Sequence, residues 1–411
     1  MNKSKILFLS TNDKGGAGWA LLKEVELLNK FGYDTTLVVC NKYSDSDACL
    51  GLIKANTRIG KIKIFINHVI CKFLKIIAFR NPIKKYIMFD IQLSYASAKQ
   101  VLSLYGKKPD IIMIGWVTDF VSTRTIKDLK IKTGAKIVYY MTDNAPIGGG
   151  CHYPWDCDGY TRNCYPCPAL KANNHRAEKT FLEKKNNIME DMIICGTTND
   201  INRASRSLLF KNNPKIIAAT LNKNPYSFSK DEGRSFFNID KSRYVILCGA
   251  DSVASERKGF KELINSLNIL SANIDVSNIV ILVAGNGKVT FPDKYEVKCV
   301  GKLSFEDLFK AYACADLFVC PSLEDSGPMM INYGVMAYIP VVCFEMGVAL
   351  DIIQHKQNGY IAKWRDIEDF ALGMQYCIQN QNVISERLYD LNNSIMKKTQ
   401  EEKSLWKALK I

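Results

Sequence analysis

The hydrophobic positions of the chain form short continuous apolar runs, separated by longer stretches in which apolar residues recur at helical spacing. The apolar runs lie at residues 5–9, 35–39, 110–114, 136–140, 191–195, 216–221, 244–248, 279–284, 315–320 and 339–344. Short apolar runs that alternate with helical patterns are typical of parallel strands buried between helices. The pattern therefore predicts an α/β fold with doubly wound parallel sheets.

The length of the chain adds the domain organisation. A chain of 411 residues is longer than most single domains and favours two. We predict a first domain over residues 1–225, a polar linker over residues 226–241 and a second domain over residues 242–390. A charged helical segment, residues 391–411, follows the second domain.

Residues 320–344 combine a buried strand, an acidic turn, a helical pattern and a second buried strand. The turn contains two adjacent acids followed by a serine and a glycine, which are Glu324, Asp325, Ser326 and Gly327. Ligands of open parallel sheets bind beyond the carboxyl ends of the strands, where the N-termini of helices attract anions. This turn is therefore expected to bind a phosphate-bearing ligand. In the alternative interpretation, the acids only cap the following helix.

Two cations precede another helical pattern in the second half of the chain. Arg257 and Lys258 stand directly before Gly259 and an amphipathic stretch. Two positive side chains beside a helix N-terminus suit a diphosphate, although a solvated helix start would have the same sequence. Gly285 follows the apolar run 279–284 and marks a further turn at the end of a predicted strand.

The first apolar run is followed by a Gly-rich turn, Gly15-Gly16-Ala17-Gly18. Glycines let a ligand approach the backbone closely. The spacing is not that of the G-x-G-x-x-G dinucleotide fingerprint, and Asp34 precedes the second predicted strand where a ribose-binding acid would follow it. The turn is therefore not expected to bind a nicotinamide cofactor.

Residues 142–168 form the most distinctive local motif. Thr142 and Asp143 are followed by three glycines, by His152 and by four cysteines, Cys151, Cys157, Cys164 and Cys167. Four thiolates would make the tetrahedral set of a structural zinc site, and His152 either replaces one of them or is a loop residue. Free thiols are the main alternative to zinc, and disulfides are the least favoured one. The start of the chain has no secretory signal pattern, so a cytoplasmic location with reduced thiols is expected.

The net charge of +14 is concentrated in one region. Residues 48–89 contain no acid and carry nine basic residues, Lys54, Arg58, Lys61, Lys63, Lys72, Lys75, Arg80, Lys84 and Lys85. Apolar residues at helical intervals in the same region predict a basic amphipathic helix. Such a helix either lies on an anionic membrane surface or is an ordinary core helix with solvated lysines. No nucleic-acid-binding module accompanies the charge, and no uncharged run reaches the roughly 18 residues of a membrane span.

Several of these motifs resemble one enzyme family. The acidic turn, aligned through Gly327 and Pro340-Val341-Val342, is similar to the donor-site motif of retaining GT-B glycosyltransferases of family 4, the glycosyl transferases group 1. The segment from Gly149 to Cys157, GGCHYPWDC, with the following C-x-x-C-P-A-L, resembles the members that assemble bacterial surface polysaccharides. The resemblance implies the GT-B architecture, in which two Rossmann-like domains face a cleft. It also implies a hinge near Asn224-Pro225 and a terminal helix that crosses back to the first domain.

The resemblance also assigns roles to residues. Lys258, Asp325 and Asp143 are the implied catalytic residues. The implied donor-binding residues are Gly16, Gly18, Thr142, Arg257, Lys258, Gly285, Glu324, Asp325, Ser326, Gly327, Asn332 and Tyr333. Three positions depart from the family pattern, because Tyr333 stands where the second acid is usual, Thr142 where a histidine is usual and Ala250 where an arginine is usual. A shift of one residue in the alignment puts Asn332, which can bond a hydroxyl, at the acid position.

The activity implied by the resemblance is that of a retaining hexosyltransferase. It would move a sugar from a nucleotide diphosphate sugar to a lipid-linked or other saccharide acceptor in the synthesis of capsule, O-antigen or exopolysaccharide. Two cations can stabilise the departing diphosphate, so no metal or other cofactor is expected for catalysis. Two alternatives remain: a GT-B binding or assembly subunit that has lost turnover, and a GT-B sugar-nucleotide epimerase.

Overall fold

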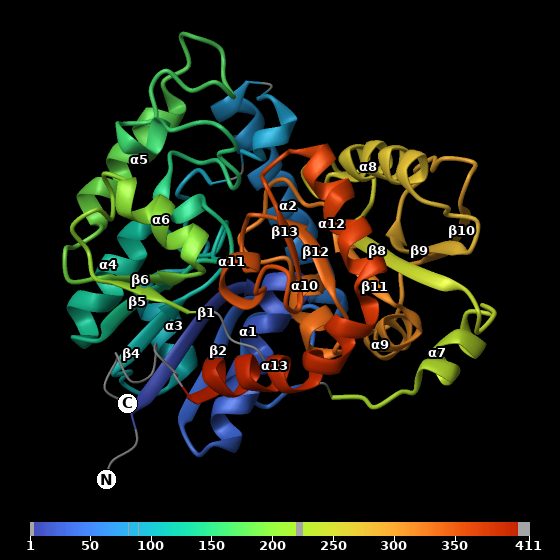
Figure 1. Cartoon of the computed structure of the whole chain (residues 1–411). Coiled ribbons are helices and arrows are strands. Elements are labelled where there is room, and N and C mark those ends of the chain that lie inside the picture. Colours follow the sequence, from blue (N-terminus) through green and yellow to red (C-terminus); the bar gives the residue numbers. More distant parts are fainter. Residues whose placement is uncertain (1–3, 81, 89, 219–224, 402–411) are drawn as a thin grey trace. The chain divides into compact units, whose positions relative to one another are not determined.

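The computed structural model describes residues 4–80, 82–88, 90–218 and 225–401 (Figure 1). These residues form two compact units. The N-terminal unit comprises residues 4–196 and 200–217, and the C-terminal unit comprises residues 197–199 and continues from Ala218. Each unit contains one sheet of parallel strands, which confirms the predicted doubly wound α/β fold.

The sheet of the N-terminal unit has the strand order β3-β2-β1-β4-β5-β6-β7 in the described residues. Its strands are β1 (Lys5–Asn12), β2 (Asp34–Lys42), β3 (Cys49–Lys54), β4 (Ile111–Ile114), β5 (Lys136–Tyr140), β6 (Ile193–Gly196) and β7 (Lys215–Ile217). The strand order reverses between β1 and β4, and ligands of open α/β sheets bind beside the carboxyl ends of strands at such a point. The loops after β1, β4 and β5 are therefore the places in this unit to look for a site.

The helices of the N-terminal unit follow the predicted pattern. They are α1 (Gly15–Lys30), α2 (Arg58–Phe79), α3 (Ala98–Tyr105), α4 (Thr123–Thr133), α5 (Arg176–Asn187) and α6 (Thr198–Arg206). Short 3-10 turns occur at Lys84–Tyr86, Ala145–Ile147 and Gly159–Thr161. Helix α1 buries Leu21, Leu22, Val25 and Leu28, as their spacing predicts.

The sheet of the C-terminal unit has the strand order β10-β9-β8-β11-β12-β13 in the described residues. Its strands are β8 (Tyr244–Ser252), β9 (Ile279–Asn286), β10 (Glu296–Gly301), β11 (Leu317–Cys320), β12 (Val341–Phe344) and β13 (Gly359–Ala362). The helices are α7 (Lys230–Phe236), α8 (Phe260–Asn273), α9 (Phe305–Cys314), α10 (Met329–Met336), α11 (Ala349–Ile352), α12 (Ile367–Gln379) and α13 (Gln381–Glu401). The order reverses between β8 and β11, so the turns after these two strands come close together.

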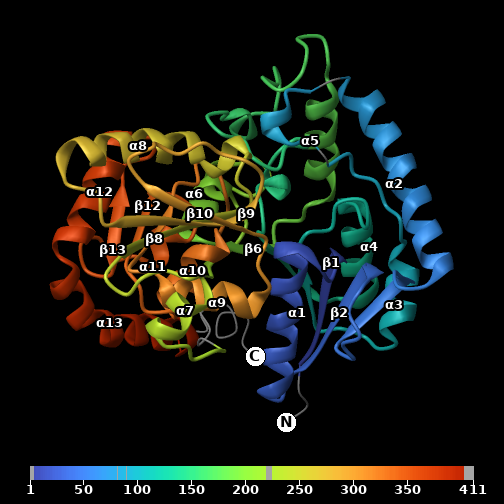
Figure 2. The ribbon, with the colours of Figure 1, turned by 90° about the vertical axis from the view of Figure 1, so that its right-hand side faces the viewer.

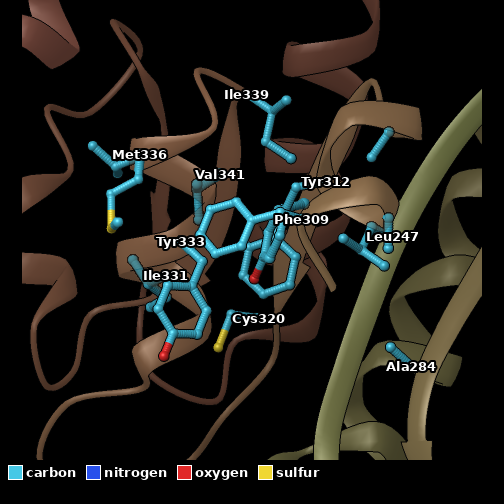
Figure 3. Packing of buried hydrophobic residues seen from close by; sticks show 14 of the residues in the cluster. Leu247, Ala284, Phe309, Tyr312, Cys320, Ile331, Tyr333, Met336, Ile339 and Val341 are labelled. Atoms are coloured by element: carbon cyan, nitrogen blue, oxygen red, sulfur yellow. The ribbon is translucent and has the colours of Figure 1, made fainter. Parts of the chain in front are cut away.

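Aromatic rings fill the core between this sheet, α9 and α10. The ring of Tyr333 lies among those of Phe309 and Tyr312 (Figure 3), and its centroid is 5.5 Å from the centroids of both Phe305 and Phe309. Edge-to-face and tilted pairs of this kind add to the stabilisation that burial gives. Tyr333, predicted from the family alignment as a donor-binding residue, thus has a packing role in this unit.

Residues 226–241, expected to be a linker, contain helix α7 and belong to the C-terminal unit. Ser229 and Glu232 form a capping box at the start of α7, and buried Arg234 donates to Asp316 over 2.8 Å. This ion pair fixes α7 beside the start of β11. Polar composition suggested a linker, whereas the polar side chains here are used to cap and anchor a short helix.

Two predicted features fall partly outside the described residues. They are the expected hinge, of which Asn224 is not described, and the terminal segment, of which residues 402–411 are not described. The described part of that segment continues helix α13, which begins at Gln381. In the described part of the chain, no helix combines the length and the apolar character needed to cross a lipid bilayer.

Candidate functional site

The acidic turn of residues 321–328 connects β11 to α10 and is bonded to the turn that follows β8. The carbonyl oxygen of Arg257 accepts hydrogen bonds from the backbone N–H of Leu323 at 2.8 Å and of Glu324 at 3.3 Å. The predicted acids and the predicted cations, far apart in the sequence, are therefore held together by backbone bonds.

Gly259 makes this approach possible. Its φ of +68° lies in the left-handed region, and a Cβ placed on it would be 1.8 Å from the carbonyl oxygen of Pro321. No side chain fits at that distance, so only glycine allows the cationic turn to lie against the acidic turn.

Three charged side chains meet where the two turns touch. Asp325 Oδ2 accepts from Arg257 Nη1 at 2.7 Å and from Lys258 Nζ at 2.6 Å. We call Arg257, Lys258 and Asp325 the donor-site cluster. Burial raises the pKa of Asp325, but Lys258 and Arg257 outweigh it and hold the pKa below its ordinary value. Arg257 and Lys258 thus both point their positive groups at the same carboxylate.

The cluster is only partly shielded from water. The side chains of Arg257 and Lys258 are 23% and 16% exposed. Glu324 and Ser326, from the same turn, are buried, and the N–H of Gly327 lies 3.4 Å from Asp325 Oδ1. The structure thus brings together the six predicted donor-binding residues that come from these two turns.

Two further predicted donor-binding residues lie on α10. Asn332 is buried, and its carboxamide oxygen has no hydrogen-bond partner among the described residues. A buried acceptor without a partner is costly, so this oxygen is available to a ligand hydroxyl. Burial raises the pKa of Tyr333 to about 12.

Gly285 lies at the end of β9, beside β8. Its φ is +133°, and a Cβ on it would be 1.8 Å from the carbonyl oxygen of Ala250. The glycine is therefore required for the close approach of the two strand ends. Its predicted contact with a donor stays a prediction.

The predicted residues of the N-terminal unit lie after β1 and β5. Gly18 is buried in α1, and a Cβ on it would be 2.2 Å from the carbonyl oxygen of Asn12, so it lets the helix pack on the strand. A Cβ on Gly16 would meet no atom within 4 Å. Of the two predicted glycines, Gly16 has open space beside it and Gly18 has a packing role.

Asp143 is bonded into the loop that follows β5. Its Oδ1 accepts from the N–H of Ala145 at 2.8 Å, and its Oδ2 lies 2.6 Å from Nδ1 of His152. Both side chains are buried. Thr142, one residue earlier, lines the same cavity as Asp143. The imidazole of His152 thus lies beside Asp143, although the position expected for a histidine is occupied by Thr142.

A buried lysine on α5 joins this loop to the segment after α2. Lys184 Nζ is 2.5 Å from Asp90 Oδ2, and it donates to the carbonyl oxygens of Ala145 at 2.6 Å and Gly148 at 2.9 Å. We call Lys184, Asp90 and these two carbonyl groups the Lys184 cluster. Burial raises the pKa of Asp90, but the charge of Lys184 outweighs burial and lowers the pKa.

Sequence reasoning missed the Lys184 cluster and the position of His152. A signal was present in the spacing, because Ala177, Thr180, Phe181 and Lys184 lie on the buried face of one helix. A lysine on such a face is rarely buried without a charged partner. The sequence does not say which acid is that partner; in the structure it is Asp90, the first acid after the acid-free segment.

The four cysteines of the motif line one cavity, together with Tyr86 and Met88. All four are free thiols, and burial raises their pKa values, that of Cys164 to about 12. Within residues 4–80, 82–88, 90–218 and 225–401, no group of three or more His, Cys, Asp or Glu side chains is placed to hold a metal ion. Four thiols are the right ligands for zinc, but their present positions do not form a closed site.

The chain is similar to known proteins in part of its sequence and in its fold. Residues 242–380 match the family model for glycosyl transferases group 1. The match contains the whole donor-site cluster and both turns that carry it. None of the curated protein sequences matches the chain.

Solved structures with the same fold cover nearly all of the chain. Sucrose-phosphate synthase from Thermosynechococcus elongatus has a TM-score of 0.62 at 13% identity, and 99% of each chain is covered. Anabaena HepE in complex with UDP and glucose has a TM-score of 0.57 at 13% identity, with 98% of this chain and 99% of that chain covered. WaaG, a glycosyltransferase involved in lipopolysaccharide biosynthesis, has a TM-score of 0.56 at 12% identity, with 96% and 95% covered. The fold is thus that of the GT-B glycosyltransferases, as predicted.

Proposed function

We propose that the chain is a glycosyltransferase that moves a sugar from a nucleotide diphosphate sugar to a saccharide acceptor. The observation that carries this proposal is the donor-site cluster, in which Arg257 and Lys258 meet at Asp325 between the ends of β8 and β11. The cluster lies within the region that matches the glycosyl transferases group 1 model.

The charges of the cluster suit the chemistry. Breaking the bond between the anomeric carbon and the diphosphate leaves negative charge on the phosphate oxygens. Arg257 and Lys258 can stabilise that charge because they are partly exposed and already fixed in position by Asp325. Asp325, with the backbone N–H of Gly327 beside it, can orient sugar hydroxyls. In this proposal Asn332 accepts a hydrogen bond from a donor hydroxyl through its carboxamide oxygen.

The resemblance and the similar structures support the finer features of the proposed reaction. The proposed reaction retains configuration at the anomeric carbon. HepE was solved with UDP and glucose, and WaaG is involved in lipopolysaccharide biosynthesis. We therefore propose a UDP-sugar as the first donor to test and a lipid-linked saccharide as the acceptor, in surface-polysaccharide assembly.

The N-terminal unit is proposed to supply Asp143, Thr142 and Gly16. Asp143 is held by Ala145 and His152, so its carboxylate has a fixed orientation. In this proposal Thr142 donates a hydrogen bond from its hydroxyl, and proton transfer by an imidazole at that position is not part of the mechanism.

The test is a panel of UDP-, GDP- and dTDP-sugars incubated with the protein and a membrane lipid extract, with products detected by mass spectrometry. Wild type should consume one donor, and Lys258→Ala should lower the rate by about 10²- to 10³-fold, as losing a group that stabilises transition-state charge does. Lys261→Ala, at an exposed lysine of α8, is the matched control and should keep full activity. Equal activity of Lys258→Ala and wild type would sink the proposal.

The alternative of a binding subunit without turnover is favoured by one observation. Tyr333 occupies the usual acid position with a ring that packs into the aromatic core. A binding subunit would consume no donor, yet nucleotide sugar would still protect it against thermal unfolding. Tyr333→Glu is a poor rescue, because it would bury a carboxylate among Phe305, Phe309 and Tyr312. An epimerase would instead convert one nucleotide sugar to its isomer without acceptor, which the same panel detects.

We further propose that Cys151, Cys157, Cys164 and Cys167 hold a structural zinc. Their convergence on one cavity supports this proposal. To bind zinc, the four sulfur atoms would have to come closer together than they are in the structure. Protein purified without a metal column should contain about one zinc per chain, because four thiolates fill the tetrahedral shell. A zinc content near zero, with four thiols that react with a thiol reagent in the native protein, would overturn it.

A further inference from the structure

Helix α2 presents its apolar side chains to solvent. Ten large apolar residues between Ile59 and Ile77 are exposed, and the aromatic rings Phe65 and Phe73 are 68% and 62% exposed. The ten are Ile59, Ile62, Phe65, Ile66, Val69, Ile70, Phe73, Leu74, Ile76 and Ile77. Exposed apolar patches of this size usually mark an interaction surface.

The opposite face of α2 contacts the N-terminal unit, and apart from Ile64 and Phe79 its residues are small or polar. Gly60 and Cys71 are buried, and Ile64, Asn67 and Ala78 are half-buried along the same line. Lys75, on this side, pairs with Asp119. The usual amphipathic arrangement is therefore reversed, because most of the large apolar residues face away from the unit.

The exposed residues form one continuous stripe. Successive residues of a helix are offset by about 100°, so the ten apolar residues cover about half of the circumference of α2. Lys61 and Lys72 lie along one border of this stripe, and Lys63 lies just inside the other, between Ile70 and Leu74. An apolar stripe with basic borders is the pattern of helices that lie in a membrane interface. Figure 2 shows α2 as one continuous helix at the border of the N-terminal unit.

The surrounding charge selects the partner. Residues 48–89 contain no acid, and Arg80, Lys84 and Lys85 follow the end of α2 directly. A second copy of the chain would bring two basic borders together, which like-charge repulsion opposes. An anionic bilayer offers negative headgroups for the lysines and acyl chains for the apolar stripe.

We propose that α2 is a membrane-docking helix that lies flat on an anionic bilayer, with its apolar stripe inserted below the headgroups. The stripe, defined by the ten exposed residues, and its basic borders act together. Neither the donor nor the acceptor takes part in this contact, so the proposal does not depend on the proposed transferase activity.

The test is co-sedimentation of the full chain with vesicles of phosphatidylcholine alone or mixed with phosphatidylglycerol. Wild type should bind the anionic vesicles and should bind the neutral ones much less. Phe65→Ser/Phe73→Ser should weaken this binding about tenfold or more, because each ring loses its apolar burial in the membrane. Lys61→Gln/Lys63→Gln/Lys72→Gln should weaken binding to anionic vesicles only.

The matched control is Phe31→Ser, at an aromatic residue that is 60% exposed at the end of α1, outside the stripe. It should bind vesicles as wild type does. Circular dichroism and thermal unfolding should be unchanged in all variants, since none of the substituted side chains is buried. The proposal is overturned if wild type does not bind anionic vesicles, or if Phe65→Ser/Phe73→Ser binds them as well as wild type does. It is also overturned if wild type forms a dimer, does not bind vesicles, and loses the dimer in that variant.

Discussion

The donor-site cluster and the Lys184 cluster both pair lysine with aspartate, but their cations differ in access to water. In the donor-site cluster two cations share Asp325, and their side chains are 16% and 23% exposed. In the Lys184 cluster one lysine, 1% exposed, is bonded to Asp90 and to two backbone carbonyl groups. The cations of the first cluster are partly open to water, whereas the single cation of the second is enclosed.

This difference indicates which cluster can bind a ligand. Partly exposed cations can exchange a carboxylate partner for phosphate oxygens more easily than an enclosed cation, because water shields the charges during the exchange. A lysine whose three donors are all used inside the protein cannot do so without leaving an unpaired charge. The Lys184 cluster therefore holds the loop after β5 in place, and the donor-site cluster is the one that meets a ligand.

The largest expected effect is on stability, from Lys184→Met. The variant leaves Asp90, whose side chain is only 13% exposed, without its counter-charge, so the free energy of unfolding should fall by about 3–5 kcal/mol. Thermal unfolding of the full chain measures the change. Lys185→Met, at the exposed neighbour on α5, is the control and should change stability little.

The double variant Asp90→Asn/Lys184→Met separates the charge effect from lost packing. Removing both charges should recover part of the stability lost in Lys184→Met. Equal stability of Lys184→Met and Lys185→Met would show that the Lys184 cluster does not stabilise the loop after β5.

A smaller effect is expected from the glycine that joins the two turns of the donor-site cluster. Gly259 and Gly301 have nearly equal φ values, +68° and +69°, but a Cβ on Gly301 would meet no atom within 4 Å. Both alanine variants incur the cost of a left-handed backbone. Gly259→Ala should lose roughly 1–3 kcal/mol more than Gly301→Ala, because its methyl group collides with Pro321.

Denaturant unfolding of the two alanine variants measures this difference. Gly259→Ala should also lower transfer activity, since Arg257 and Lys258 move with the displaced turn. Equal stability of the two variants would contradict the close contact between the cationic and acidic turns.

The smallest effect is a pH dependence at Asp325. Its pKa lies below the ordinary value of 3.8 because of Lys258 and Arg257, so the ion pairs stabilise the fold above that pH and stop doing so as pH falls through the lowered pKa. Asp325→Asn should therefore cost about 1 kcal/mol at neutral pH, with partial exposure of the cations limiting the loss. Denaturant unfolding from about pH 7 to about pH 3 should show the difference from wild type shrinking at the acid end. A difference independent of pH would mean that the carboxylate charge is not what stabilises the turn.

The sheet and the two turns of the candidate site could be predicted from the sequence because their signals are local. The run at residues 136–140 is strand β5, and the acidic and cationic turns follow β11 and β8 as expected. Apolar runs and turn residues act within a few positions of the chain. The order of strands in a parallel sheet then brings turns from neighbouring strands together.

Other features depended on partners that are distant in the sequence. The partner of Lys184 is Asp90, and the residue beside Asp143 is His152, although the family pattern places a histidine at position 142. Tyr333 was expected to contact the donor, whereas its ring completes an aromatic core with residues of α9. No local pattern in the sequence specifies which of several acids or rings will be nearest.

Local sequence patterns were enough to predict that α2 is amphipathic and basic, and that charged turns follow β8 and β11. Periodicity gives the two faces of a helix, because side chains repeat every 3.6 residues. The packing of the folded chain, in contrast, leaves the apolar stripe of α2 facing solvent and encloses Lys184 but not Lys258. Burial depends on what the rest of the chain packs against each face, and that packing is a property of the whole fold.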